Sequence, residues 1–244
     1  MIRIENLTKK YGTKEAVKGI SFEVKEGEML ALLGVNGAGK TTTIKMLSCL
    51  SKPSGGSAEI AGYDVVEESD KVKKMIGVST QDTAIAKNLS VEENLQFMAD
   101  IYLDDEEYTK KDRVAHVNDI IKSFKLDEVR KTRSGKLSGG WQRRLSIAMA
   151  IIGDPKVLFL DEPTLGLDVL ARRELWKEIE NLKRDKTIIL TTHYMEEAEE
   201  LADRIAIMIN GNIVMMGDLA ALEEKTGQKG LENVFVAVAE GESK

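Results

Sequence analysis

The chain has 244 residues, of which 42% are hydrophobic and 31% charged, so it is long enough to bury a large core. Its net charge of −6, with acidic and basic residues mixed along the chain, argues against general binding to nucleic acid, and its single cysteine, Cys49, excludes an internal disulfide framework. The N-terminus is too polar for a signal peptide, and no apolar run approaches the roughly 20 residues that cross a bilayer. We therefore expect a cytoplasmic protein that meets a membrane only through a partner.

Two kinds of strand pattern occur along the chain. Residues 1–27 and 54–65 alternate apolar with polar positions and contain turn glycines, which predicts a small antiparallel sheet. Continuous apolar runs, typical of strands buried on both faces of a mostly parallel sheet, occupy residues 29–34, 157–161, 187–192 and 204–211. Helical patterns follow three of these runs, and the repeated order of strand and helix predicts an α/β fold.

A third region interrupts this order. Residues 89–152 favour helix and contain no convincing strand, which predicts a helical subdomain inserted between two strands of the sheet. We expect one domain over residues 1–244, with a catalytic core at 1–88 and 153–244 and the helical subdomain at 89–152. In the helix after residues 157–161, the spacing predicts that Leu175, Trp176, Ile179 and Leu182 share one face.

The segment GVNGAGKTT, at residues 34–42, matches the phosphate-binding pattern G-x-x-x-x-G-K-[ST] between a buried strand and a helix. Backbone N–H groups in such a loop surround a phosphate, and glycine at positions 37 and 39 lets it approach. Lys40 is expected to reach the β- and γ-phosphates, and the Thr41 hydroxyl to bind Mg²⁺. The predicted nucleotide-binding residues of this P-loop are Gly34, Val35, Asn36, Gly37, Ala38, Gly39, Lys40, Thr41 and Thr42.

Two consecutive carboxylates end the strand at residues 157–161. Adjacent residues at a strand end point to opposite sides, so we expect different roles for them. Asp161 is predicted to hold Mg²⁺, directly or through water, and Glu162 to orient and deprotonate the attacking water. The plainer alternative is that the pair caps the next helix. His193 follows another buried strand at the expected ligand-binding edge, where it would hydrogen-bond the γ-phosphate, although a single histidine is more often structural.

Weaker signals come from positions near turns. Gln81 follows a predicted strand at residues 74–79, and its amide is expected to contact Mg²⁺ or the water. Tyr11 offers an aromatic face for a purine ring, with Val17 packing nearby. Gly139 and Gly140 open a predicted helix and expose N–H groups at its positive end, which favours an anion.

Taken in order and spacing, these motifs resemble the nucleotide-binding domain of ATP-binding cassette (ABC) proteins. LSGGW, at residues 137–141, resembles that family's signature motif, except that Trp141 replaces the usual glutamine; we expect this change to alter packing rather than phosphate contact. The resemblance implies a P-loop ATPase fold, with ATP and Mg²⁺ as cofactors and a head-to-tail pair of subunits. In such a pair, Ser138, Gly139 and Gly140 serve the ATP of the partner, and Asp168 lies across the interface.

Finer features resemble the ATPase subunits of ABC-2-type exporters, chiefly GLDVLARRELWKEI and the ending LENVFVAV, although a proline usual near Val169 or Leu170 is absent. This resemblance implies an integral membrane partner, a second ATPase subunit that is identical or closely related, and a position on the cytoplasmic face of the membrane. The alternative is a soluble ABC ATPase that acts on ribosomes or DNA. A switch that does not hydrolyse ATP is disfavoured because Glu162 and His193 are both present.

Overall fold

The computed structural model describes residues 1–103, 106–183 and 185–241, and the chain forms two compact units. The first unit combines Met1–Lys73 with Lys183–Lys244, and the second is Lys74–Leu182. The predicted helical subdomain at 89–152 falls within the second unit, although its residues 104–105 lie outside the described residues. The finer division at residues 88 and 152 stays a prediction.

An antiparallel sheet opens the first unit, as the alternating patterns predict. It contains β1 (Ile2–Tyr11), β2 (Lys14–Val24), β4 (Gly55–Ile60) and β5 (Tyr63–Asp64) in the order β2-β1-β4-β5. Ile2 pairs with Val24 and Ile4 with Phe22. All four side chains are buried because alternate residues of a strand face the same side.

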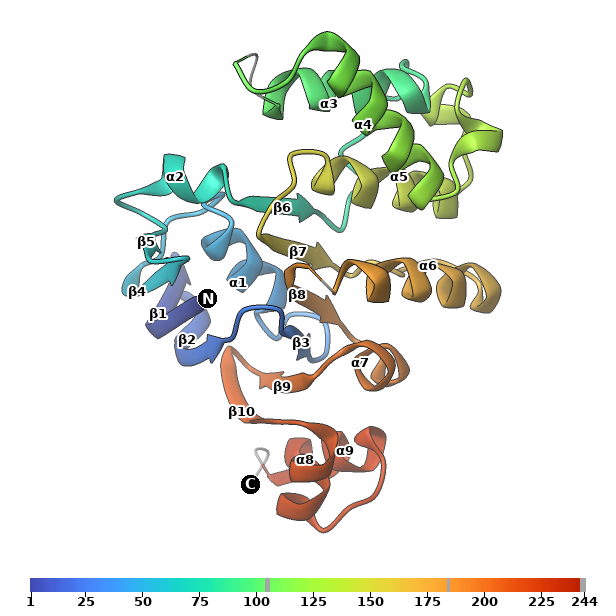
Figure 1. The fold of residues 1–244 in the computed structure, drawn as a ribbon. Helices are drawn as coiled ribbons and strands as arrows, with labels where there is room; N and C mark the ends of the chain where they lie inside the picture. The colour runs from blue at the N-terminus through green and yellow to red at the C-terminus, as the bar shows by residue number, and fades with distance from the viewer. Residues whose placement is uncertain (104–105, 184, 242–244) are drawn as a thin grey trace. The chain divides into compact units, whose positions relative to one another are not determined.

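A second set of strands in this unit is mostly parallel. The buried strand β3 (Met29–Leu33) pairs in parallel with both β8 (Thr187–Thr192) and β9 (Arg204–Ile209), and β10 (Asn212–Gly217) pairs antiparallel with β9 (Figure 1). The register sets Leu33 beside Thr192 and Ile207, so β3 and β8 end together, two residues before the end of β9. The α/β class predicted from the apolar runs is confirmed, whereas β10 was not predicted.

Helices cover the strands of the first unit. Both α1 (Lys40–Leu47) and α2 (Ser69–Lys73) belong to its N-terminal part, and α7 (Met195–Leu201) packs against β3 and β8. After β10, α8 (Leu219–Thr226) and α9 (Leu231–Gly241) pack against each other, and α9 also contacts α7. Among the described residues, no helix combines the length and the apolar character that spanning a bilayer requires.

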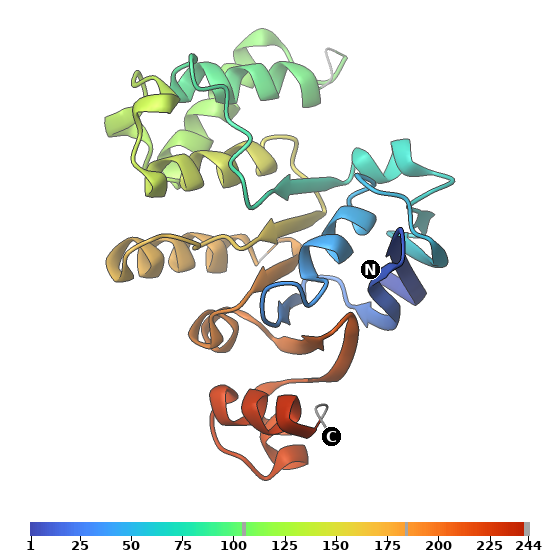
Figure 2. The same cartoon turned by 180° about the vertical axis from the view of Figure 1, so that it is seen from behind.

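The second unit holds two parallel strands, β6 (Ile76–Ser79) and β7 (Val157–Asp161), together with a group of helices. The helices are α3 (Val91–Tyr102), α4 (Lys110–Ser123), α5 (Gly139–Ile151) and α6 (Val169–Leu182), with short 3-10 turns at Asp127–Val129 and Ser134–Lys136. Seen from behind, α3 lies beside α4 and α5 (Figure 2). In the described part of 89–152 there is no strand apart from an isolated bridge between Ser90 and Arg133, as predicted.

Side-chain caps begin two of these helices, and one buried amide side chain links the segments before two of them. Ser90 with Glu93 and Thr109 with Asp112 form capping boxes at the starts of α3 and α4. Buried Asn94 accepts a bond from the Ala86 amide at 2.8 Å and donates to the Ser134 hydroxyl at 2.8 Å. This side chain therefore ties the loop before α3 to the turn that precedes α5.

Glu92 gives the second unit a pH-dependent ion pair. Its carboxylate pairs with both Arg130 and Lys131, which lower its pKa from 4.5 to about 2. A pKa that is lower in the folded state stabilises the fold above about pH 4.5, and this contribution is lost as the pH falls toward 2. We expect Glu92→Gln to reduce the free energy of unfolding at pH 7 by about 1 kcal/mol, because the pair is partly exposed to solvent.

Denaturant unfolding of the two proteins at pH 7 and near pH 2 tests this expectation. The difference between wild type and variant should shrink as the pH falls. A difference that stays constant with pH would remove the Glu92 charge as its cause.

Candidate nucleotide-binding site

The P-loop connects β3 to α1 in the first unit, and its glycines are required by both backbone conformation and packing. Gly37 and Gly39 have φ values of 85° and 110°, which residues with a side chain rarely adopt. A Cβ on Gly39 would lie 2.6 Å from the Ala16 carbonyl oxygen, and one on Gly34 would lie 2.3 Å from that of Met208. Gly39 thus has a packing role that sequence reasoning, which assigned it only to phosphate approach, did not include.

Lys40 directs its ammonium group back toward the start of this loop. The side chain is buried, and Nζ donates hydrogen bonds to the carbonyl oxygens of Gly34 at 2.7 Å and Val35 at 3.4 Å. Thr41 and Thr42 are half-buried in the first turn of α1, and Val35, Asn36 and Gly37 are exposed. The ammonium group and the positive end of α1 together favour an anion at the loop.

The edge that carries the P-loop also carries His193. The amide of Gly34 donates to the Thr192 carbonyl at 3.2 Å, and His193 follows Thr192 directly. Its half-buried ring lies 4.1 Å, centroid to centroid, from the ring of Tyr194. The first unit therefore brings His193 to the start of the phosphate-binding loop, although the two segments are far apart in sequence.

The predicted base-binding residues lie on the antiparallel sheet. Tyr11 ends β1 with 51% of its surface exposed, and Lys9 Nζ lies 5.1 Å from the centre of its ring. Val17 is fully buried in β2, where it pairs with Lys9. The ring of Tyr11 is thus accessible to a ligand, and the contacts of Tyr11 and Val17 with a nucleotide stay predictions.

Asp161 and Glu162 lie in the second unit, at and just beyond the end of β7. Both are buried, at 3% and 4% exposure, so the chain removes two carboxylates from water at adjacent positions. Glu162 has φ of 52°, a left-handed conformation that is costly for a residue with a side chain and is concentrated at functional sites. Because the backbone leaves the extended conformation at Glu162, its side chain does not follow the alternating pattern of β7.

The alternative that this pair caps the next helix does not fit the structure. Helix α6 begins at Val169, and its N-terminal amides at Leu170 and Ala171 are bonded to Asp168 Oδ1, at 2.9 and 3.0 Å. Asp168 is therefore the capping residue. Its predicted place at a subunit interface stays a prediction.

The signature residues begin α5. Ser138 takes the extended N-cap conformation without a side-chain capping bond, and Ser138 and Gly139 are exposed. In the part of the chain that the structure describes, a Cβ built on Gly139 would meet nothing within 4 Å, and one on Gly140 would make only ordinary contacts, 3.7 Å from Leu167 and 3.9 Å from Ala171. Packing among the described residues of the unit therefore does not require either glycine.

Buried charges surround this helix, and they were not predicted from the sequence. The guanidinium of Arg144 bonds to Glu174 at 2.6 Å, pairs with Glu178 at 3.0 Å and lies 5.1 Å from the centre of the Trp141 ring. Burial raises the pKa of Glu178, and the positive charges of Arg144 and Lys125 oppose this change. The predicted apolar face of α6 holds at Leu175, Trp176 and Ile179, whereas Leu182 is only half-buried.

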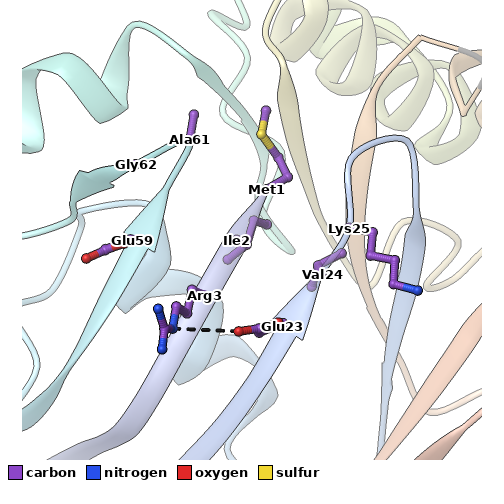
Figure 3. A pocket seen from close by; sticks show the side chains of 9 residues that line it. All are labelled: Met1, Ile2, Arg3, Glu23, Val24, Lys25, Glu59, Ala61 and Gly62. Carbon is purple, nitrogen blue, oxygen red and sulfur yellow. Dashed lines mark ion pairs between the residues drawn. The ribbon is translucent and has the colours of Figure 1, made fainter.

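A separate pocket of about 330 Å³ lies on the antiparallel sheet and is lined by parts of β1, β2 and β4 (Figure 3). Arg3 reaches across it to Glu23, with 3.6 Å between Nε and Oε1. None of the predicted nucleotide-binding residues lines this pocket, so it does not bear on the candidate site.

Comparison with known proteins gives the family. The sequence profile described as ABC transporter matches residues 17–165. The chain is 40% identical over 224 residues to the Nod factor export ATP-binding protein I of Burkholderia orbicola (strain AU 1054), covering 91% of this chain and 72% of that protein. It is 39% identical over 230 residues to the phospholipid-transporting ATPase ABCA3 of Homo sapiens, covering 93% of this chain but only 13% of that protein.

A solved structure supports the same conclusion. The dimeric, post-hydrolysis state of the ATP-binding cassette MJ0796 bound to ADP and Pi is similar to this chain with a TM-score of 0.80 and 26% identity, covering 90% of this chain and 99% of that one. The chain belongs to the ABC transporter family and has the α/β fold of that family's ATP-binding cassettes.

Proposed function

We propose that this chain is the ATP-hydrolysing subunit of a transporter, in which two subunits close head to tail around ATP and drive a separate membrane-spanning subunit. The glycine pair that opens α5 carries this proposal. Among the described residues, a Cβ on Gly139 would meet nothing within 4 Å, so its lack of a side chain would serve a group from outside the chain. A phosphate bound on a second subunit is such a group.

The P-loop residues 34–42 would hold the phosphates of ATP. Their N–H groups, the α1 N-terminus and the buried ammonium of Lys40 provide hydrogen-bond donors and positive charge for the β- and γ-phosphates. Tyr11 would stack on the base. The hydroxyl of Thr41, the carboxylate of Asp161 and the amide oxygen of Gln81 are hard oxygen donors that suit Mg²⁺, which when bound would neutralise charge on the phosphate oxygens.

Hydrolysis requires a water that is aligned and deprotonated. Glu162 would accept the proton of the water as its oxygen attacks the γ-phosphorus, and the bond from that phosphorus to the bridging oxygen would break to release ADP. His193, at the start of the P-loop, would donate a hydrogen bond to the γ-phosphate. Burial of Glu162 supports this role because exclusion of bulk water strengthens its interaction with the attacking water.

Closure of the pair would depend on the γ-phosphate. Ser138, Gly139 and Gly140 of one subunit would contact the nucleotide on the P-loop of the other, and Asp168 would lie at the interface. ATP would then favour the closed pair by mass action, and loss of the γ-phosphate would release it. The dimeric state of the similar MJ0796 cassette with ADP and Pi supports this arrangement.

The membrane subunit and direction of transport are proposed from relatives. The name of the bacterial relative, a Nod factor export ATP-binding protein, supports an exporter rather than a soluble ATPase on ribosomes or DNA. We expect the chain on the cytoplasmic face of the cell membrane, with the membrane subunit in contact near residues 81–94. A second ATPase subunit, identical or closely related, would complete the pair.

Purification from solubilised membranes tests this function. A tagged copy of the chain, expressed in its own organism, should retain an integral membrane protein in fixed ratio, and mass spectrometry should identify it. A tagged copy of an unrelated cytoplasmic ATPase serves as control. Co-sedimentation with ribosomes, without any membrane protein, would overturn the proposal in favour of the alternative.

A further inference from the structure

The signature helix α5 packs against β6 (Figure 1). Two contacts join the helix to the strand, and a third joins it to the two residues that follow the strand. At the C-terminal end of the helix, a Cβ on Gly77 would lie 2.0 Å from the Ala150 carbonyl oxygen, so only glycine permits this approach. One helical turn earlier, the hydroxyl of Ser146 lies 3.0 Å from that of Ser79, and both are buried. The strand positions are two residues apart and therefore share one face.

The third contact continues this series beyond the strand. Arg143 donates from one guanidinium nitrogen to the Thr80 carbonyl at 2.8 Å and from the other to the Gln81 carbonyl at 2.6 Å. Only 5% of the side chain is exposed. Its planar fork suits two adjacent carbonyls, whereas a lysine ammonium would act as a single point of charge.

The neighbouring arginine has a different environment. Arg144 is equally buried, but its guanidinium contacts Glu174 and Glu178 of α6. Two adjacent residues of one helix thus hold two different segments, and only Arg143 contacts the backbone at Gln81.

We propose that Arg143 is a positioning residue that fixes the backbone of Gln81 to the helix of the signature motif. Gln81 is exposed, so its side chain is free to reach the Mg²⁺ or water of the nucleotide, while its backbone stays attached to α5. A change in the contact of Gln81 would be passed to Ser138–Gly140 at the start of the same helix. This inference rests on the proposed function and names a means by which its two ATP-contacting segments are coupled.

Hydrogen exchange of the nucleotide-free protein tests whether Arg143 holds the backbone at Gln81. Arg143→Met should raise the exchange rate of a peptide covering residues 80–86 by about threefold or more, because the loop loses its attachment. Arg144→Met is the matched control and should leave that peptide unchanged. Equal exchange in Arg143→Met and wild type would overturn the inference.

A double-substitution cycle tests whether Arg143 acts through Gln81. In a Glu162→Gln background, the Mg²⁺ concentration that gives half-maximal ATP-driven dimerisation is measured by sedimentation for Arg143→Met, Gln81→Ala and the double variant. Each single variant should raise this concentration by about tenfold relative to the Glu162→Gln parent. The double variant should raise it by less than about twofold beyond either single variant. Effects that multiply in the double variant would mean a general structural role and overturn the inference.

Two further results distinguish a failure of the proposed role of Arg143 from a failure of the proposed function. Arg143→Lys keeps the charge and should fold where Arg143→Met does not; it should show an intermediate shift, and a wild-type value would overturn the two-carbonyl role. If the Glu162→Gln parent does not dimerise with ATP and Mg²⁺ at all, the proposed function fails. The exchange experiment needs no nucleotide, so it would still show whether Arg143 holds the backbone at Gln81.

Discussion

Replacing Glu162 with glutamine is expected to slow ATP turnover by about 10²- to 10⁴-fold and to leave ATP binding intact. Glutamine has the size of glutamate but does not accept a proton from water at neutral pH. The position is buried, and the backbone takes a left-handed turn there, so a side chain of equal shape is the substitution least disturbing to the fold. The variant should bind ATP and remain a closed dimer.

Steady-state phosphate release, nucleotide binding and sedimentation together measure these effects. Glu180→Gln, an exposed glutamate in α6, is the control and should turn over ATP at the rate of the wild type. Turnover by Glu162→Gln at the normal rate would remove Glu162 from its role as general base. Loss of ATP binding would instead mean that the carboxylate serves the nucleotide before hydrolysis.

Replacing Ser138 with arginine is expected to reduce hydrolysis by about 10²-fold or more while the isolated subunit still binds ATP. Ser138 is exposed and makes no capping bond with its side chain, so the larger residue costs the fold little. In a head-to-tail pair, however, the arginine would occupy the place of the partner's γ-phosphate. The subunits would then fail to close around ATP.

The control for this experiment is Ser123→Arg, which adds the same side chain at an exposed position in the same unit. It should hydrolyse ATP normally. Poor ATP binding by monomeric Ser138→Arg would mean that the signature acts within its own chain. Full hydrolysis by a strictly monomeric wild-type subunit, at any dilution, would exclude the paired mechanism altogether.

Much of the fold follows from local sequence patterns. Apolar runs at residues 29–34 and 187–192 predict strands that are buried along their whole length, because both faces of such a sheet are covered. Strand β10 was missed although its signal was present. Asn210 and Gly211 take φ values of 49° and 87°, and the Asn-Gly pair is the strongest short-range indication of a hairpin.

The candidate site was only partly predictable. The P-loop has a spacing that is specific because Gly37, Gly39 and Lys40 each meet a distinct need of a bound phosphate. The left-handed turn at Glu162 was not visible in the sequence, since glutamate has no local preference for that conformation. The burial of Arg143 and Arg144 was hidden for another reason: charged residues near a helix start ordinarily face solvent.

The sequence by itself determined the strands of the apolar runs, the helices that follow them and the phosphate-binding loop, because periodicity and glycine conformation act between residues that are neighbours in the chain. Tertiary structure alone decided which charges are buried and what they hold. Arg143 contacts the carbonyl of a residue 62 positions earlier, and Arg144 contacts Glu174, 30 positions later. Such partners are chosen by the packing of α5 on β6 and beside α6, and no local rule contains that packing.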